Sequence, residues 1–96
     1  MPHYIINNKT FKNKTAVYLH TKNLLYNHGY GVIKRGDLEF DFLQELIKLH
    51  PDYETKIGIG LKFFKLSQNK QNIRAIHMDI ERLDHTYTAI SWDFRK

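Results

Sequence analysis

The chain of 96 residues has no cysteine, only two prolines and a single tryptophan. Without cysteine there is neither a disulfide framework nor a thiolate metal site, so nothing indicates an oxidising compartment. The longest apolar runs are a few residues, and the first residues lack the basic-then-apolar layout of a signal peptide. We therefore expect an intracellular protein, cytoplasmic if its source is a bacterium or phage, with no membrane partner.

Carboxylates are absent from two long segments. Residues 1–36 hold six lysines or arginines and no acid, and residues 55–74 hold five basic residues and no acid. Residues 37–54 reverse the sign, with six carboxylates against Lys48 alone, and the net charge of the chain is +5. Clustered basic side chains attract polyanions through counterion release. This pattern predicts an RNA or DNA partner, and the alternative is that the acidic and basic segments pair with each other.

The composition supports one packed core. Apolar residues make up 42% of the chain and aromatic residues 14%, which is more than a disordered chain contains. A length of 96 residues suits one compact domain. We expect a single domain over residues 1–96.

The first half of the chain predicts a hairpin and two helices. In "HYIINNKTF" the Asn7-Asn8 pair tolerates turn geometry, so residues 4–6 and 9–11 are expected to pair. A helix is expected over about 13–27, with Gly29 after its end. Its apolar face has spacings of three and four residues and consists of Val17, Thr21, Leu24, Leu25 and His28.

A loop with Gly31 and Gly36 is expected to lead to the second helix, in "LEFDFLQELIKLH". Its wide apolar stripe consists of Phe42, Leu43, Leu46, Ile47 and Leu49. Asp37 or Asp41 can cap its start. His50-Pro51 is expected to end it, because the residue before proline disfavours the α region and proline has no amide hydrogen.

The second half of the chain alternates apolar and polar residues, as strands do. "GLKFFKL", "RAIHMDIERL" and "TYTAISWDF" are the predicted strands, and Ile90, Trp92 and Phe94 share one face of the last. We therefore predict an α+β fold: a small single domain with a short N-terminal hairpin and two helices packed on one face of an antiparallel sheet, which a C-terminal three-strand meander completes.

The segment between the second helix and the sheet contains Gly58 and Gly60 beside Lys56. Glycines permit positive φ and close backbone approach, so a tight structural crossing is the favoured interpretation. The amides of such a turn beside a lysine can also cradle a phosphate, which is the alternative. His50, Pro51, Gly58 and Gly60 are therefore treated as a structural motif.

The same residues resemble the DCL (defective chloroplasts and leaves) domain family, also written DeCL, from about Phe11 to Trp92. The resemblance rests on Phe11 with Lys14, on "DFLQELIKLHP", on Lys56 with Gly58 and Gly60, on Phe64, on Arg82-x-Asp84 and on Ile90-Ser91. His85 and Ala89 depart from the family pattern. The resemblance implies a domain that handles RNA or DNA, because members are linked to ribosomal RNA processing in plastids, occur at the tail of a plant RNA polymerase subunit, and include small bacterial or phage proteins.

No motif in the chain indicates an enzyme. The six histidines lack the spacing of a zinc helix, and there is no nucleophile elbow or P-loop. His77 and Asp79 share one strand face, but nothing supports a cluster around them. We expect no catalysis, no cofactor and no metal.

The expected binding residues are basic. A common polyanion-binding surface is predicted from Lys12, Lys14, Lys22, Lys56, Lys62 and Lys65. Aromatic rings on a basic sheet face can stack bases, and strand phase predicts that Tyr87 and one of Phe63 and Phe64 are exposed. For any single ring, core packing or cover of a sheet edge is the favoured interpretation. The alternative function is a protein-interaction module, such as a small phage or host factor that contacts a polymerase, nuclease or ribosomal protein.

Overall fold

The structure is a computed structural model, which describes residues 4–72 and 75–93. Nine helices and strands follow one another along this part of the chain. The first five are β1 (Tyr4–Ile6), β2 (Lys9–Phe11), α1 (Lys14–His28), β3 (Gly31–Lys34) and α2 (Leu38–Ile47). The last four are α3 (Tyr53–Ile57), β4 (Leu61–Gln68), β5 (Ile76–Arg82) and β6 (Tyr87–Ala89).

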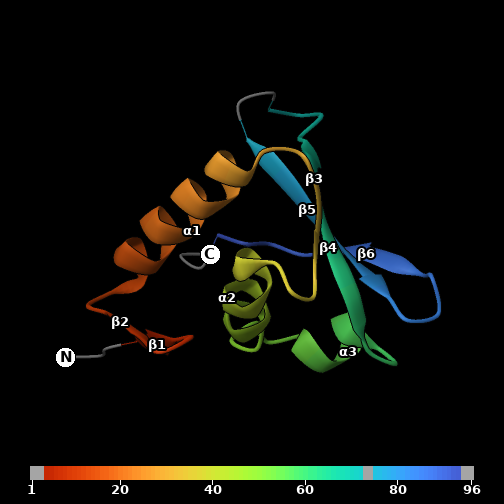
Figure 1. The fold of residues 1–96 in the computed structure, drawn as a ribbon, viewed down its shortest axis with the longest axis horizontal. Coiled ribbons are helices and arrows are strands. Elements are labelled where there is room, and N and C mark those ends of the chain that lie inside the picture. The colour runs from red at the N-terminus through yellow and green to blue at the C-terminus, as the bar shows by residue number, and fades with distance from the viewer. Residues whose placement is uncertain (1–3, 73–74, 94–96) are drawn as a thin grey trace.

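The strands form two separate antiparallel sheets. The β1–β2 hairpin is a two-stranded sheet, and the second sheet has the order β3-β4-β5-β6. In Figure 1, α2 lies between α1 and the four-stranded sheet, and the hairpin lies beside the start of α1. Both long helices therefore lie on one side of that sheet. The predicted α+β class with a hairpin, helices on one sheet face and a C-terminal meander is confirmed.

The hairpin forms because its turn residues accept positive φ. Asn7 and Asn8 have φ of 51° and 67°, which is the geometry of a two-residue turn between twisted strands. The register pairs Tyr4 with Phe11 and Ile6 with Lys9. Ile6 is only 1% exposed, so this small sheet is anchored in the core by its inward side chain.

Helix α1 begins and ends as the sequence predicts. The side chain of Asn13 accepts a hydrogen bond from the amide of Ala16 at 2.8 Å, and Gly29 closes the helix with φ of 79°. Val17, Thr21 and Leu25 are fully buried. The expected apolar face is therefore the packed one.

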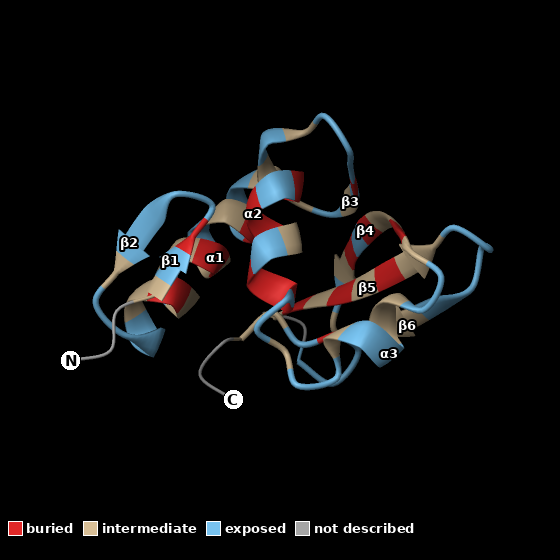
Figure 2. Cartoon of the chain, turned by 90° about the horizontal axis from the view of Figure 1, so that it is seen from below, coloured by how far each residue is buried: buried red, intermediate tan, exposed pale blue. Residues whose placement is uncertain are grey.

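The core lies between α2 and the sheet (Figure 2). The rings of Phe40 and Phe64 meet with centroids 5.4 Å apart, and Phe64 is completely buried. On the other side of α2, Phe42 packs against Phe11 of the hairpin. Because α2 is buried on both sides, its apolar stripe is wide.

Four details differ from the expectations. Residues 31–34 form β3 rather than a loop, and they pair with β4 so that Ile33 lies opposite Phe64. Residues 53–57 form the short helix α3 in place of an irregular crossing. Leu49 was expected in the core but is 47% exposed, because α2 ends at Ile47. The last strand ends at Ala89, and the expectation for Phe94 lies outside the described residues.

Candidate nucleic-acid interface

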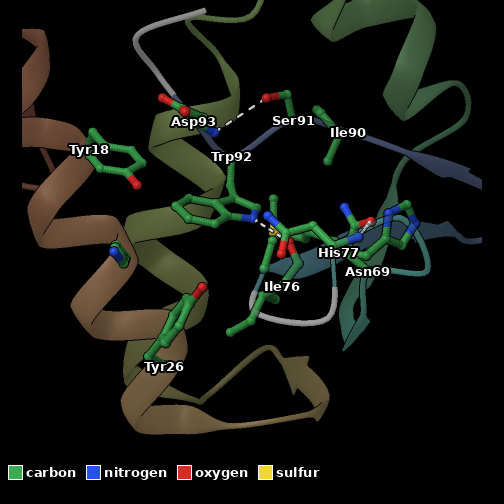
Figure 3. Close-up of a pocket in the computed structure, with 13 residues that line it drawn as sticks. Tyr18, Tyr26, Asn69, Ile76, His77, Ile90, Ser91, Trp92 and Asp93 are labelled. Atoms are coloured by element: carbon green, nitrogen blue, oxygen red, sulfur yellow. Dashed lines mark hydrogen bonds between the residues drawn. The ribbon is translucent and has the colours of Figure 1, made fainter.

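A groove with aromatic and basic walls lies between α1, the start of β5 and the segment that follows β6 (Figure 3). Its volume is about 400 Å³. Tyr18, Lys22 and Tyr26 come from α1, where a spacing of four residues places them on one helix face. Trp92 lies opposite them. We refer to this hollow as the α1 groove.

Trp92 joins the two walls of the α1 groove. Its ring is parallel to that of Tyr18 within 6°, with centroids 5.8 Å apart. Its Nε1 donates a hydrogen bond to the carbonyl oxygen of Ile76 at 2.8 Å. Figure 3 shows the indole between Tyr18 and Ile76. The indole position is therefore fixed by α1 on one side and by β5 on the other.

Lys22 carries the positive charge of the groove. Its Nζ lies 6.0 Å from the centroid of the Tyr18 ring and 5.7 Å from that of Tyr26. Such ammonium–ring contacts stabilise the position of the cation. No carboxylate occurs in residues 1–36, so α1 brings only positive charge to this wall. The α1 groove thus combines flat apolar rings with a held ammonium group.

The segment after β6 separates this groove from a second hollow of about 620 Å³. Ser91, Trp92 and Asp93 line both hollows. Lys14 lines the second one, near the first turn of α1. The structure therefore brings two of the predicted lysines, Lys14 and Lys22, to the two sides of one segment.

The other predicted lysines lie elsewhere. Lys12 is exposed between β2 and α1. Nζ of Lys56, on α3, donates to the carbonyl oxygen of Ala89 at 3.0 Å. Lys62 and Lys65 belong to the sheet face opposite the helices, where Nζ of Lys62 lies 3.6 Å from Oε2 of Glu81. The six lysines therefore do not form the one common surface that was expected. The sheet separates Lys62 and Lys65 from Lys14 and Lys22 on the helix side.

The aromatic residues follow the predicted strand phase. Phe64 is buried, Phe63 lies on the opposite face, and Tyr87 is 72% exposed. Tyr18, Tyr26 and Trp92 were not predicted as binding residues. The i, i+4 spacing of Tyr18, Lys22 and Tyr26 was the available signal. The approach of Trp92 to that helix face could not be read from the sequence.

The Gly58-x-Gly60 turn is a close crossing. A Cβ on Gly58 would lie 3.0 Å from Cδ of Arg82, and one on Gly60 would lie 2.7 Å from a methyl group of Leu83. The Gly58 amide donates to the carbonyl of Glu54, and the Gly60 amide donates to that of Ile57. Both amides are thus engaged within the chain, which favours the structural interpretation over a phosphate cradle.

The residues around His50 also have local partners. The Nδ1 of His50 accepts a hydrogen bond from the amide of Asp52 at 3.0 Å. Pro51 follows in the turn between α2 and α3. His50 and Pro51 thus belong to the turn that connects α2 to α3, and the His50 side chain stabilises that turn.

Titratable groups do not gather into a metal site in the described residues. No group of three or more histidine, aspartate or glutamate side chains suits a metal ion within residues 4–72 and 75–93. His77 and Asp79 form an isolated pair, with 2.9 Å between Nε2 and Oδ1. Among these same ranges, no helix is long and apolar enough to cross a membrane.

Comparison with protein families gives one assignment. A family model described as a protein of unknown function, DUF3223, matches residues 22–92, which is more than half of the chain. The chain belongs to the DUF3223 family. The DCL resemblance was therefore wrong as a family assignment, since the matching model is that of DUF3223, an uncharacterised family. Lys22, Tyr26 and Trp92 of the α1 groove fall inside the matched region.

Comparison with solved structures supports the fold. The solution NMR structure of an uncharacterised protein from Rhodospirillum rubrum is 23% identical, with a TM-score of 0.83. The match covers 97% of this DUF3223 chain and 86% of the other. No curated protein matches the sequence. At this level of identity the likeness concerns the fold alone.

Proposed function

We propose that this DUF3223 domain is a non-catalytic intracellular module that binds single-stranded RNA or DNA in the α1 groove. The observation that carries the proposal is the placement of the Lys22 ammonium group over two tyrosine rings beside the Tyr18–Trp92 stack. Sites for single strands combine positive charge along the backbone with rings on which bases stack. The groove provides both within about 400 Å³.

The geometry favours single strands over duplexes. A base can reach a ring only when it is unpaired or unstacked, and every base has a flat face for Tyr26 or Trp92. Lys22 then contacts a phosphate as a point charge, and Lys14 offers a second contact beyond Ser91. Contacts of this kind bind with little preference for sequence.

The test uses fluorescence anisotropy of labelled oligothymidine and oligouridine at several salt concentrations. We expect binding near micromolar dissociation constants that weakens as salt rises. Changing Lys14 and Lys22 together to alanine should lower the salt slope by about 1.4, since each phosphate contact on a single strand contributes about 0.7. The matched control is Lys48→Ala, which removes an exposed lysine just after α2 that is paired with Glu45.

Trp92 provides a second readout. It is the sole tryptophan of the chain, so its fluorescence reports on the α1 groove without a label. We expect oligonucleotides to quench this fluorescence in wild type and in Lys48→Ala. Absence of any salt-dependent binding up to about 100 µM protein would overturn the proposal, because even non-specific complexes have dissociation constants of about 1–100 µM.

A separate observation favours the second candidate function, protein binding. Ile59 and Leu83 are 66% and 55% exposed. The Leu83 amide donates to the carbonyl of Gly60 at 3.0 Å, which places Leu83 beside the residue that follows Ile59. Exposed apolar side chains that adjoin one another are typical of contact surfaces. If the domain binds no nucleic acid, this pair becomes the first surface to test by substitution.

A further inference from the structure

The α1 groove adjoins a further hollow at the start of β5, distinct from the one that Lys14 lines. That hollow has a volume of about 550 Å³ and shares Asn69 and His77 with the groove. It extends onto the sheet face opposite the helices, where Asp79 and Tyr87 line both it and another hollow, beside Phe63 and Lys65. The α1 groove and these two hollows thus follow one another, through shared lining residues, from α1 past the start of β5 to the outer sheet face. We call this succession the path.

The outer sheet face presents two aromatic rings. The register places Phe63 of β4 opposite Glu81 of β5, and Glu81 opposite Tyr87 of β6. The two rings thus come from the strands on either side of β5, whose backbones lie about 10 Å apart. Tyr87 is 72% exposed, and the long helices lie on the other side of the sheet. These rings are available for stacking.

Three lysines (Lys22, Lys65 and Lys70) and three carboxylates (Asp79, Glu81 and Asp93) line the path. Asp79 and Glu81 face the path. Asp79 shares a hydrogen bond of 2.9 Å with the ring of His77, and Nζ of Lys62 lies 3.6 Å from Oε2 of Glu81, so a lysine offsets the second carboxylate. Lys65 and Lys70 also line the path. Neither of these two lysines is ion-paired with another residue in the described part of the chain. Their ammonium groups are therefore the ones available to phosphates.

We propose that a single strand bound in the α1 groove continues past Asn69 and His77 onto the outer sheet face. There its bases stack on Tyr87 and Phe63, and Lys65 and Lys70 contact its phosphates. This inference rests on the proposed function and deepens it by specifying an extended site. From His77 to Glu81 the path spans five residues of β5, and the four steps between them cover about 13 Å.

The proposal predicts a dependence on strand length. An oligothymidine of about two nucleotides fills only the groove, whereas one of about eight nucleotides reaches both parts, within the range of known single-strand sites. We expect the longer strand to bind more tightly to wild type. Tyr87→Ala should weaken the longer strand about 5- to 150-fold, the range for loss of one base–aromatic stack, and leave the short strand unchanged.

The experiment compares wild type, Tyr87→Ala and a control variant by Trp92 fluorescence and by anisotropy. The control is Leu38→Ala, which removes a 90% exposed apolar side chain from the start of α2, away from the path. Equal affinities of short and long strands, with no effect of Tyr87→Ala, would overturn the extension and leave the groove proposal standing. Failure of every oligonucleotide to bind wild type would overturn both.

Discussion

Nε of Arg82 donates a hydrogen bond to the carbonyl oxygen of Lys56, 2.8 Å away, and so connects the end of β5 to α3. The same guanidinium group donates from Nη1 to the hydroxyl of Thr86 at 3.1 Å. Arg82 thus links a helix, a strand and the turn before β6. The Gly58 turn passes directly over this side chain, which explains why a Cβ there would lie within 3.0 Å of it.

Replacing Arg82 with methionine should lower the free energy of unfolding by about 1–3 kcal/mol. Methionine keeps an unbranched stem but removes both donors, so the Lys56 carbonyl loses its partner. Arg82→Lys should be nearly as unstable as Arg82→Met, because one ammonium group lacks the planar fork that reaches two acceptors. Urea unfolding of the three proteins measures the differences. Equal stability of wild type and Arg82→Met would show that these bonds contribute nothing.

Replacing Gly60 with alanine should destabilise the fold through backbone strain. Its φ of 139° is rarely adopted by other residues, and such strain costs about 1–3 kcal/mol. The nearby Leu83 is 55% exposed and can rotate away, so the close approach adds little. Gly36→Ala is the matched control, with φ of 98° and open space around the added Cβ. Similar losses of melting temperature in both variants are expected.

The same Gly60 variant also separates the two interpretations of the turn. A structural crossing requires that lost stability and any lost binding appear together. Unchanged stability with abolished nucleic-acid binding would instead restore the phosphate-cradle alternative, despite the engaged amides of Gly58 and Gly60.

Stability should fall at acidic pH because of His20. Its ring lies between Phe11 and Phe42, with centroid distances of 5.4 and 4.8 Å. Burial, with a smaller contribution from the charge of Lys9, lowers its pKa below the ordinary value of 6.5. The folded state therefore favours the neutral ring. The stabilisation is complete above the unfolded pKa and is lost as pH falls from about 6.5 through the lowered folded value.

Urea unfolding at about pH 7.5 and pH 5 checks the effect of His20. His20→Phe keeps an aromatic ring in the same place but cannot take up a proton. The loss of stability between the two pH values should be smaller in His20→Phe than in wild type. An identical loss in both proteins would assign the acid sensitivity to other groups.

Removing the cap of α1 should destabilise the domain modestly. Asn13→Ala deletes the acceptor for the Ala16 amide and should lower the free energy of unfolding by about 1 kcal/mol. Asn13→Ser keeps a capping oxygen and is the control. Thermal unfolding followed by circular dichroism should rank wild type and Asn13→Ser together above Asn13→Ala.

Local patterns predicted the larger elements well because their signals are local. The glycine at position 29 and the periodic face of α1 both act within a few residues. The same holds for the Asn7-Asn8 turn and for the opposite exposure of Phe63 and Phe64. These features follow from backbone geometry and from one buried face, so a single sequence contains the information.

The missed elements depend on distant partners. β3 is four residues long and begins with glycine, and its pairing with β4 determines its conformation. α3 has five residues, too few for a periodic signal. The α1 groove likewise needs Trp92 to reach α1 from the far end of the chain. Charge alone indicated lysines, but their distribution over the two sides of the sheet required the topology.

The contact between Lys56 and Ala89 has a consequence for self-association. Between β5 and the last segment, the backbone amide of Arg82 donates to the carbonyl of Thr86, and the amide of Ile90 donates to that of Met78. In an antiparallel pair, hydrogen-bonded and non-hydrogen-bonded positions alternate. Ala89, opposite Asp79, is at a non-hydrogen-bonded position, so its carbonyl points away from β5. It would otherwise be an acceptor on an open strand edge, ready to pair with another chain. The Lys56 ammonium group occupies it at 3.0 Å and sets a positive charge beside the edge. Lys56 of α3 therefore disfavours edge-to-edge pairing of β6 with another chain.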